Sequence, residues 1–188
     1  MPRILIGVTG SVATIKLTEL TKTIHDLIAE AEIRIVLTHH ALHFTPGIDE
    51  SILAYTDEDE WALWKQRGDP VLHIELAKWA EYLLIAPLDA NTLAKIAGGL
   101  CDNMLTCVLR AWPQARRNNV LLAPAMNTVM WDSPITSRQI ALIKELFCYH
   151  FVDPISKQLV CGDTGMGAMA EPKTIAKELA KLICINKS

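Results

Sequence analysis

The sequence of 188 residues lacks the features that mark several large classes of protein. It has no apolar run approaching the ~18 residues that a helix needs to cross a bilayer. Its formal net charge is −3, and its lysines and arginines are scattered singly, so no basic stripe is available to bind a phosphate backbone. We therefore expect no membrane and no nucleic acid among its partners.

Cysteine is scarce, with five residues and no CxxC pair. This pattern predicts neither a disulfide framework nor a zinc site, and the cluster of His39, His40 and His43 has no metal-ligand partner pattern. The chain passes from Met1 almost directly into a strand pattern, which leaves no room for a signal peptide. These observations favour a reducing, cytoplasmic setting and no bound metal.

Apolar residues make up 51% of the chain, enough for one sizeable core, and no repeat or linker divides it. Four short and nearly continuous apolar runs are typical of strands buried on both faces of a parallel sheet, at residues 4–8, 33–38, 82–86 and 120–123. Helical patterns occupy 17–31, 72–80, 92–98, 103–112, 134–146 and 173–184. The alternation predicts an α/β fold, with residues 1–188 forming a single domain. We expect a doubly wound parallel sheet in a Rossmann-like or flavodoxin-like three-layer sandwich.

Small and polar residues follow the predicted strands, and they would meet along the carboxyl edge of the sheet, where such folds bind ligands. After the first strand, Gly10 and Ser11 open a helix, so backbone N–H groups and a hydroxyl could approach a phosphate. The motif is neither GxGxxG nor a Walker loop, and a tight turn that needs glycine also explains it. By itself it is a weak indication of a mononucleotide.

The segment from Asp89 to Thr92 follows the third strand and offers amide and hydroxyl groups at another helix start. Such groups suit the polar edge of a flavin or its phosphate. Ordinary capping of the helix by Asp89 or Thr92 is the alternative. The position at the same sheet edge favours the ligand.

Three further residues could carry chemistry, each with an ordinary alternative. His73 lies at a predicted helix start among apolar neighbours, where a histidine is usually structural. Asn127 combines an amide that can donate to a carboxylate with nearby methionine and tryptophan, but asparagine also suits a core turn. Cys161 begins a glycine-rich segment, 161–171, which suits a mobile flap with a proton-donating thiol or simply a surface loop.

The acidic run at 57–60 is typical of a solvated patch. Trp61 and Trp64 beyond it could pack at a subunit contact or cover the core.

Together, these segments resemble the homo-oligomeric flavin-containing cysteine decarboxylases, and within them the phosphopantothenoylcysteine decarboxylases of coenzyme A synthesis. The resemblance runs from Gly7 to about Pro172, in the family's order. Its segments are GVTGSVATIK, YTDEDEW, GDPVLHIELAKWA, IAPLDANTLAKIAGGLCDNMLTCVLRAW, PAMNTVMW and CGDTGMGAMAEP. The last four are highly specific in combination.

The resemblance implies a role for individual residues. His73 would be the active-site base, Asn127 would hold the cysteine carboxylate of the substrate, and Cys161 would donate a proton. Met169 would belong to a substrate clamp. The implied FMN contacts are Gly10, Ser11, Val12, Thr38, Asp89, Ala90, Asn91, Thr92 and Ala125.

Asp89 departs from the family, because relatives commonly carry serine there. Its charge would disfavour a nearby phosphate unless it faces away or caps the helix. The family assembles as trimers or multiples of trimers with flavin near the subunit interface. The resemblance therefore implies a homotrimer, or a multiple of it, in which two chains build each site.

The implied reaction is the decarboxylation of the small molecule 4′-phospho-N-pantothenoylcysteine to 4′-phosphopantetheine. A carboxylate beside a saturated carbon has no place for the electrons of the breaking bond, so an electron sink is needed. In the implied mechanism, His73 assists deprotonation, FMN oxidises the thiol-bearing carbon to a thioaldehyde, and CO2 leaves. The enethiolate is then reduced, with a proton from Cys161.

Three alternatives stay open. They are a peptidyl-cysteine decarboxylase, a flavin prenyltransferase of similar fold, and a non-catalytic regulatory subunit of a protein phosphatase from the same family. The Cys161 segment favours the pantetheine pathway over the peptidyl enzyme. Regulatory members commonly carry long acidic extensions, which these 188 residues do not show, so we expect an enzyme.

Overall fold

A computed structural model describes residues 1–45, 47–158 and 164–186 of the protein. Its centre is a six-stranded sheet in the order β3-β2-β1-β4-β5-β6, in which every neighbouring pair is parallel. The strands are β1 (Arg3–Val8), β2 (Glu32–Leu37), β3 (Leu53–Tyr55), β4 (Tyr82–Leu88), β5 (Val120–Pro124) and β6 (His150–Phe151). The strand order reverses between β1 and β4, and this switch point is where open α/β sheets form their ligand crevice.

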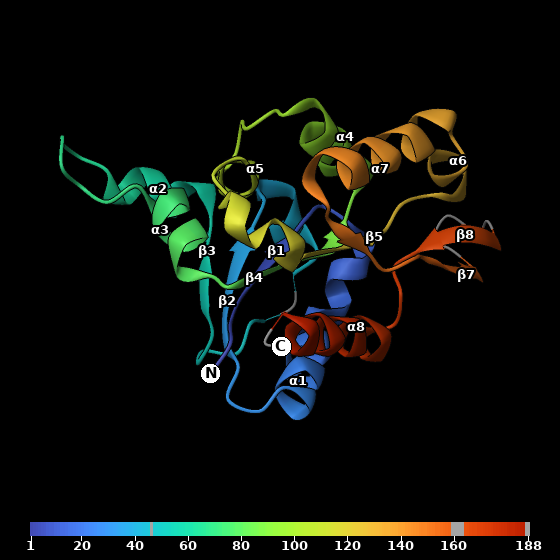
Figure 1. Ribbon diagram of the computed structural model, residues 1–188, viewed down its shortest axis with the longest axis horizontal. Helices are drawn as coiled ribbons and strands as arrows, with labels where there is room; N and C mark the ends of the chain where they lie inside the picture. The colour runs from blue at the N-terminus through green and yellow to red at the C-terminus, as the bar shows by residue number, and fades with distance from the viewer. Residues whose placement is uncertain (46, 159–163, 187–188) are drawn as a thin grey trace.

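Helices cover both faces of the sheet (Figure 1). Helices α1 (Leu17–Leu27) and α8 (Pro172–Ile185) lie on one face. The other face carries α3 (Leu72–Trp79), α4 (Ala90–Gly98), α5 (Met104–Arg110) and α7 (Pro134–Phe147). Two short helices, α2 (Asp57–Leu63) and α6 (Thr128–Trp131), lie at opposite sides of the molecule. The 3-10 helices are η1 (Val12–Lys16), η2 (His39–His43) and η3 (Gln114–Asn119).

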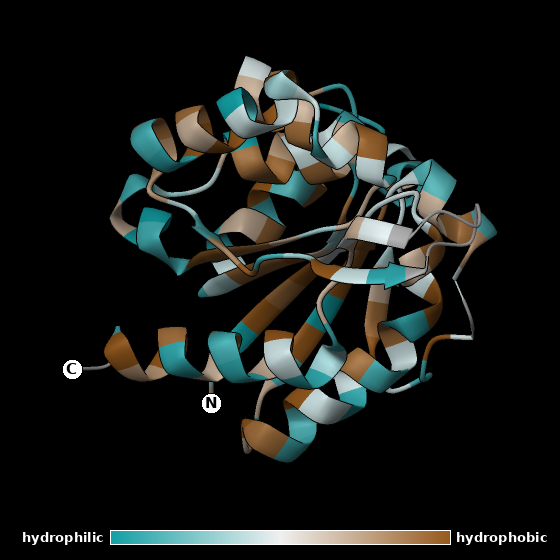
Figure 2. Ribbon diagram, turned by 90° about the vertical axis from the view of Figure 1, so that its right-hand side faces the viewer, coloured by the Kyte–Doolittle hydropathy of each residue, from teal (hydrophilic) through white to brown (hydrophobic). Residues whose placement is uncertain are grey.

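The strands separate two apolar layers because alternate side chains of each strand point to opposite faces. Ile4 and Ile6 of β1 pack with α1 and α8, whereas Leu5 between them packs with α3 and α5. Figure 2 shows the apolar residues gathered along the strands, between two layers of helices with polar outer surfaces. This arrangement confirms the predicted doubly wound, three-layer α/β sandwich.

The four strands predicted from apolar runs are β1, β2, β4 and β5, and the six predicted helices are α1, α3, α4, α5, α7 and α8. Pro134 and Pro172 lie in the first turns of α7 and α8, as their fixed φ allows. A separate antiparallel hairpin of β7 (Ile155–Gln158) and β8 (Thr164–Ala168) was not expected. Within the predicted flap or loop over 161–171, residues 164–168 form the strand β8, and residues 169–171 lead into α8. Across the described ranges, no helix has the length and apolarity to cross a bilayer.

Candidate active site

Thr9 ties together the two loops at the switch point. Its side chain is fully buried, and its hydroxyl donates to the Pro87 carbonyl at 2.9 Å while accepting from the Asp89 N–H at 2.9 Å. The Thr14 hydroxyl donates to the Thr9 carbonyl at 3.0 Å and so fixes the start of the η1 turn. Thr9 was not predicted as a site residue, although it lies between Gly7 and Gly10 in the glycine motif after the first strand. The loop that carries Gly10 and Ser11 is thus held against the loop after β4.

Gly10 brings a third loop to the same place. A Cβ atom at this position would lie 2.6 Å from the Cβ of His40, so no larger residue fits without displacing η2. Thr38, which caps η2, is 6% exposed, and its N–H donates to the Val8 carbonyl at 3.1 Å. The loops after β1, β2 and β4 therefore converge at the carboxyl edge, as their order in the sheet requires.

The residues of these loops differ in how open they are. Ser11 caps η1, because its hydroxyl accepts from the Ala13 N–H at 3.3 Å, and Val12 beside it is 37% exposed. Asn91 is exposed, whereas Thr92 is only 2% exposed. The edge therefore offers the Ser11 hydroxyl and the Asn91 amide at two helix starts, and this donor set fits a mononucleotide such as FMN.

Asp89 caps α4. Its carboxylate accepts from the Thr92 N–H at 2.7 Å, in the geometry of an N-cap. This is the capping alternative to a direct phosphate contact, and it places the charge on the helix start. Ala90, the first residue of α4, is half-buried.

Asn127 follows β5 and caps the short helix α6. Its Oδ1 accepts from the Val129 N–H at 2.8 Å, and Ala125, two residues before it, is only 4% exposed. Because the amide oxygen is turned toward the helix backbone, the amide nitrogen is the atom suited to donate to a carboxylate. Both readings of Asn127, a turn residue and a carboxylate donor, are thus compatible with one conformation.

The hairpin packs directly on the Asn127 segment, and two glycines permit the contact. The Met126 N–H donates to the Gly167 carbonyl at 2.9 Å. A Cβ at Gly167 would collide with the Met126 carbonyl oxygen, and one at Gly165 would lie 2.6 Å from Thr128 Cγ2. We call Met126–Trp131 together with β7 and β8 the α6–β8 end of the molecule.

Two predicted site residues lie near this hairpin in sequence. Cys161 falls outside the described residues. Met169 directly follows β8 and is 4% exposed, packed in the core layer that contains α1 and α8. Its buried side chain is therefore not on an open surface.

His73 lies near the start of α3 and is held by a carboxylate from α2. Glu60 Oε1 lies 2.5 Å from His73 Nδ1 and accepts from the His73 backbone N–H at 3.2 Å. The Glu60 side chain is 12% exposed and that of His73 24%. One carboxylate oxygen therefore fixes both the backbone and the ring of His73, and sequence analysis missed this partner.

The acidic run 57–60 fits the predicted solvated patch only in part, because Glu58 and Asp59 are exposed whereas Asp57 and Glu60 are half-buried. Asp57 accepts from the Met104 N–H at 2.6 Å and so connects α2 to the start of α5, while Asp59 accepts from the Thr56 N–H at 2.7 Å in a capping box. Glu58, with a side chain 68% exposed, and the exposed Asp59 fit the expectation. The patch was misjudged because composition does not reveal which carboxylates find donors.

A family model described as Flavoprotein matches residues 1–184. The chain belongs to the Flavoprotein family. Phosphopantothenoylcysteine decarboxylase of Mus musculus is 49% identical over 181 residues, which cover 96% of this chain and 87% of the relative. The predicted resemblance to the phosphopantothenoylcysteine decarboxylases is confirmed.

Two solved structures are similar over almost the whole length of the chain. One is a PPC decarboxylase mutant in complex with pantothenoylaminoethenethiol, with 46% identity, a TM-score of 0.90 and coverage of 100% of this chain and 99% of the other. The other is the FMN binding protein AtHal3, with 47% identity, a TM-score of 0.88 and coverage of 100% and 98%.

In this flavoprotein, one chain does not bring His73 and Asn127 together. Figure 1 shows α2 and α3 at one end of the longest axis and α6, β7 and β8 at the other. We call Asp57–Trp79 the α2–α3 end. Trp61 and Trp64 are 73% and 46% exposed there, so they do not cover the core.

Proposed function

We propose that the protein catalyses the FMN-dependent decarboxylation of 4′-phospho-N-pantothenoylcysteine to 4′-phosphopantetheine in coenzyme A biosynthesis, in the cytoplasm. The observation that carries the proposal is the likeness, over nearly the full chain, to the mouse decarboxylase. The geometry of the sheet edge is compatible with it, because the loops after β1, β2 and β4 converge at the switch point and carry the Ser11 hydroxyl and an exposed Asn91.

The FMN site in this proposal is the convergence of the loops after β1, β2, β4 and β5. Its contacts are Gly10, Ser11, Val12, Thr38, Asp89, Ala90, Asn91, Thr92 and Ala125. Asp89 would contribute by packing alone, because its carboxylate caps α4 and its N–H donates to Thr9. When bound, FMN would accept two electrons from the substrate and later return them, which supplies the electron sink that the saturated carbon lacks. No external electron donor is then consumed.

His73 acts as the base in this proposal, and Glu60 determines which ring nitrogen can act. With Glu60 accepting from Nδ1–H, the neutral ring carries its lone pair on Nε2. That nitrogen can take the proton as the thiol-bearing carbon is oxidised to a thioaldehyde. The carboxylate then stabilises the imidazolium that forms, in the manner of a carboxylate and histidine pair in a hydrolase triad.

Asn127 and Cys161 serve the later steps. The Asn127 amide nitrogen would donate to the substrate carboxylate and orient the bond to CO2 while it breaks. The electrons of that bond then remain on the substrate as an enethiolate, and the Cys161 thiol would give the carbon a proton during reduction to the saturated product. Met169 is assigned to the clamp on the substrate through its backbone, because its side chain packs in the core layer of α1 and α8.

A shared site between copies follows from the separation of His73 and Asn127. We propose a homotrimer, or a multiple of it, in which the α2–α3 end of one copy lies against the α6–β8 end of the next. Each end exposes large apolar side chains, as an interface core requires. They are Trp61 and Trp64 at one end and Val129, 75% exposed, and Met130, 50% exposed, at the other.

The test is a direct one. The purified protein should be yellow with bound FMN, should release CO2 from 4′-phospho-N-pantothenoylcysteine, and should form 4′-phosphopantetheine. Preference for a peptide ending in cysteine would favour the peptidyl-cysteine decarboxylases. A colourless protein that FMN cannot reconstitute would exclude the proposal, and inhibition of a protein phosphatase without turnover would favour a regulatory subunit.

A further inference from the structure

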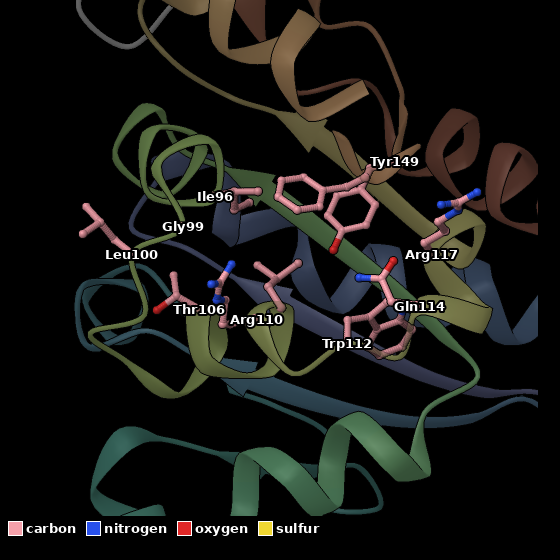
Figure 3. Close-up of a pocket in the computed structure, with 11 residues that line it drawn as sticks. Ile96, Gly99, Leu100, Thr106, Arg110, Trp112, Gln114, Arg117 and Tyr149 are labelled. Carbon is pink, nitrogen blue, oxygen red and sulfur yellow. The ribbon is translucent and has the colours of Figure 1, made fainter. Parts of the chain in front are cut away.

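A cavity lies apart from the residues of the predicted flavin site. It has a volume of about 70 Å³ and lies between the end of α4, helix α5, and the segments that lead into β5 and β6 (Figure 3). Its lining residues are Ile96, Gly99, Leu100, Thr106, Leu109, Arg110, Trp112, Gln114, Arg117, Phe147 and Tyr149. None of the predicted catalytic or cofactor residues is among them. The cavity therefore needs an explanation of its own.

The inner wall is aromatic and firmly held. Trp112 and Tyr149 are 5% and 6% exposed. Phe147 stacks on Tyr149 with ring centroids 5.3 Å apart, and the Trp112 indole N–H donates to the Arg116 carbonyl at 2.8 Å. Because these rings are packed and the indole is already paired, the wall is a preformed surface.

The Tyr149 hydroxyl is the polar group that this wall offers. Figure 3 shows it pointing into the cavity, and within residues 1–45, 47–158 and 164–186 it has no hydrogen-bond partner. Burial raises the pKa of Tyr149 to about 12, because a phenolate would lose its hydration there. The hydroxyl therefore keeps its proton at neutral pH and can donate it to a ligand.

Positive charge lies at the mouth of the cavity. The guanidinium of Arg110 runs beside Gly99, where an added Cβ would lie 3.6 Å from Nη1, and Figure 3 shows it turned toward the cavity. Neither Arg110 nor Arg117 forms an ion pair with the described residues, and none of the eleven lining residues is acidic. Gln114, on the same rim, adds an amide that can donate. An unpaired guanidinium and a hydroxyl that opens into the cavity from a buried ring together select an anion.

We propose that this cavity binds the carboxylate or phosphate group of a small organic anion, with Arg110 and Tyr149 as its principal ligands. Sites for whole drug-sized ligands are about 300–1,000 Å³, so a cavity of about 70 Å³ admits one anionic group and excludes FMN. The proposal does not depend on the decarboxylase activity.

The experiment uses the FMN-loaded protein, so that phosphate cannot occupy the flavin site. Binding of inorganic phosphate is followed by the ³¹P linewidth and binding of acetate by saturation transfer to its methyl protons, at constant ionic strength with sodium chloride. Arg110→Gln should weaken the preferred anion at least tenfold, and Tyr149→Phe several-fold. Lys22→Gln removes one exposed positive charge on α1 and should change nothing.

The two anions distinguish the sources of the ligand group. Preference for phosphate assigns the site to a phosphate monoester, and preference for acetate assigns it to a carboxylate. Failure of both anions to bind, or equal weakening by Arg110→Gln and Lys22→Gln, would overturn the proposal. Loss of flavin absorbance is monitored in every variant, so a misfolded protein is recognised by a separate signal.

Discussion

At the α2–α3 end, the predicted base His73 is held by Glu60, a carboxylate from a neighbouring helix that is largely removed from solvent. At the α6–β8 end, Asn127 is held by the backbone of its own short helix, and a hairpin packs on it through two glycines. At the first end, a carboxylate holds the imidazole of His73 by charge. At the second end, close packing of the backbone and the hairpin holds the segment that carries the Asn127 amide. The comparison suggests that electrostatic changes will act most strongly at one end and steric changes at the other.

The largest expected effect comes from removing the predicted catalytic group at each end in a separate variant. His73→Asn and Asn127→Asp should each lower turnover by about 100-fold or more, because each removes a group that acts on the substrate. Asp at position 127 keeps an oxygen that can cap α6, so the helix start is preserved. If two chains build each site, co-expression of the two variants should restore activity.

The restored rate is itself informative. In a randomly mixed cyclic trimer, a site is intact only when the chain that supplies His73 carries Asn127→Asp and the chain that supplies Asn127 carries His73→Asn. About a quarter of sites meet this condition in an equal mixture. Turnover no higher than that of either variant alone would mean that the two residues do not meet across an interface.

A smaller effect is expected from Glu60→Gln, which keeps the shape of the side chain and removes its charge. We expect turnover to fall by about 10- to 100-fold, as for the loss of other groups that orient a histidine. The loss should appear in kcat, because Glu60 orients the imidazole and does not bind the substrate. The measurement is kcat and KM at one fixed pH.

Glu58→Gln is the matched control for this prediction. Glu58 belongs to the same acidic run, but its side chain is 68% exposed. Its neutralisation should leave kcat unchanged. An equal loss of kcat in both variants would show that the general field of the acidic run, and not the contact with His73, supports turnover.

The strands and the loops that follow them could be predicted from the sequence, whereas two contacts between distant residues could not. The strands β1, β2, β4 and β5 were predictable because each is a continuous apolar run, and the convergence of Gly10, Thr38 and Asp89 followed from their places after parallel strands. The Glu60 contact was not predictable, because the partner comes from another helix whose residues have the composition of a solvated surface. Thr9 was hidden for a similar reason, since its buried partners lie 78 and 80 residues away.

Shape at the α6–β8 end is tested by Gly167→Ala. Gly167 has a φ of 134° and no room for a Cβ against the Met126 carbonyl, so alanine should be strained and should also push the hairpin away. We expect a loss of about 1–3 kcal/mol, read from the midpoint of urea unfolding at fixed protein concentration. Hydrogen exchange in β7 should accelerate.

Gly68→Ala, at the α2–α3 end, provides the control. Gly68 has a φ of 107°, also in the region that favours glycine, but nothing lies within 4 Å of its Cβ position. It therefore reports the backbone strain alone. Equal losses in the two variants would indicate that the contact with Met126 contributes nothing.

The smallest effect on stability and turnover is expected from changing Glu171, a carboxylate that is more exposed than Glu60. Glu171 accepts from Lys16 Nζ at 2.7 Å and lies 3.9 Å from Lys157 Nζ of β7, but its side chain is 48% exposed. The hydrogen bond from Lys16 lowers the pKa of Glu171 below its ordinary value. Since a lowered carboxyl pKa stabilises the folded state only where the group is ionised, the contribution is present above the ordinary pKa and is lost as the pH falls through the lowered one.

Glu171→Gln should therefore destabilise the protein at pH 7 by no more than about 1 kcal/mol, because solvent screens the pair. The difference from the parent protein should narrow as the pH falls below about 4. Urea unfolding at several pH values measures both. Turnover should stay within twofold, in contrast to Glu60→Gln, since a solvated ion pair at the hairpin neither faces the imidazole nor fixes its ring. A loss of activity comparable to that of Glu60→Gln would mean that charge acts as strongly at the α6–β8 end as at the α2–α3 end.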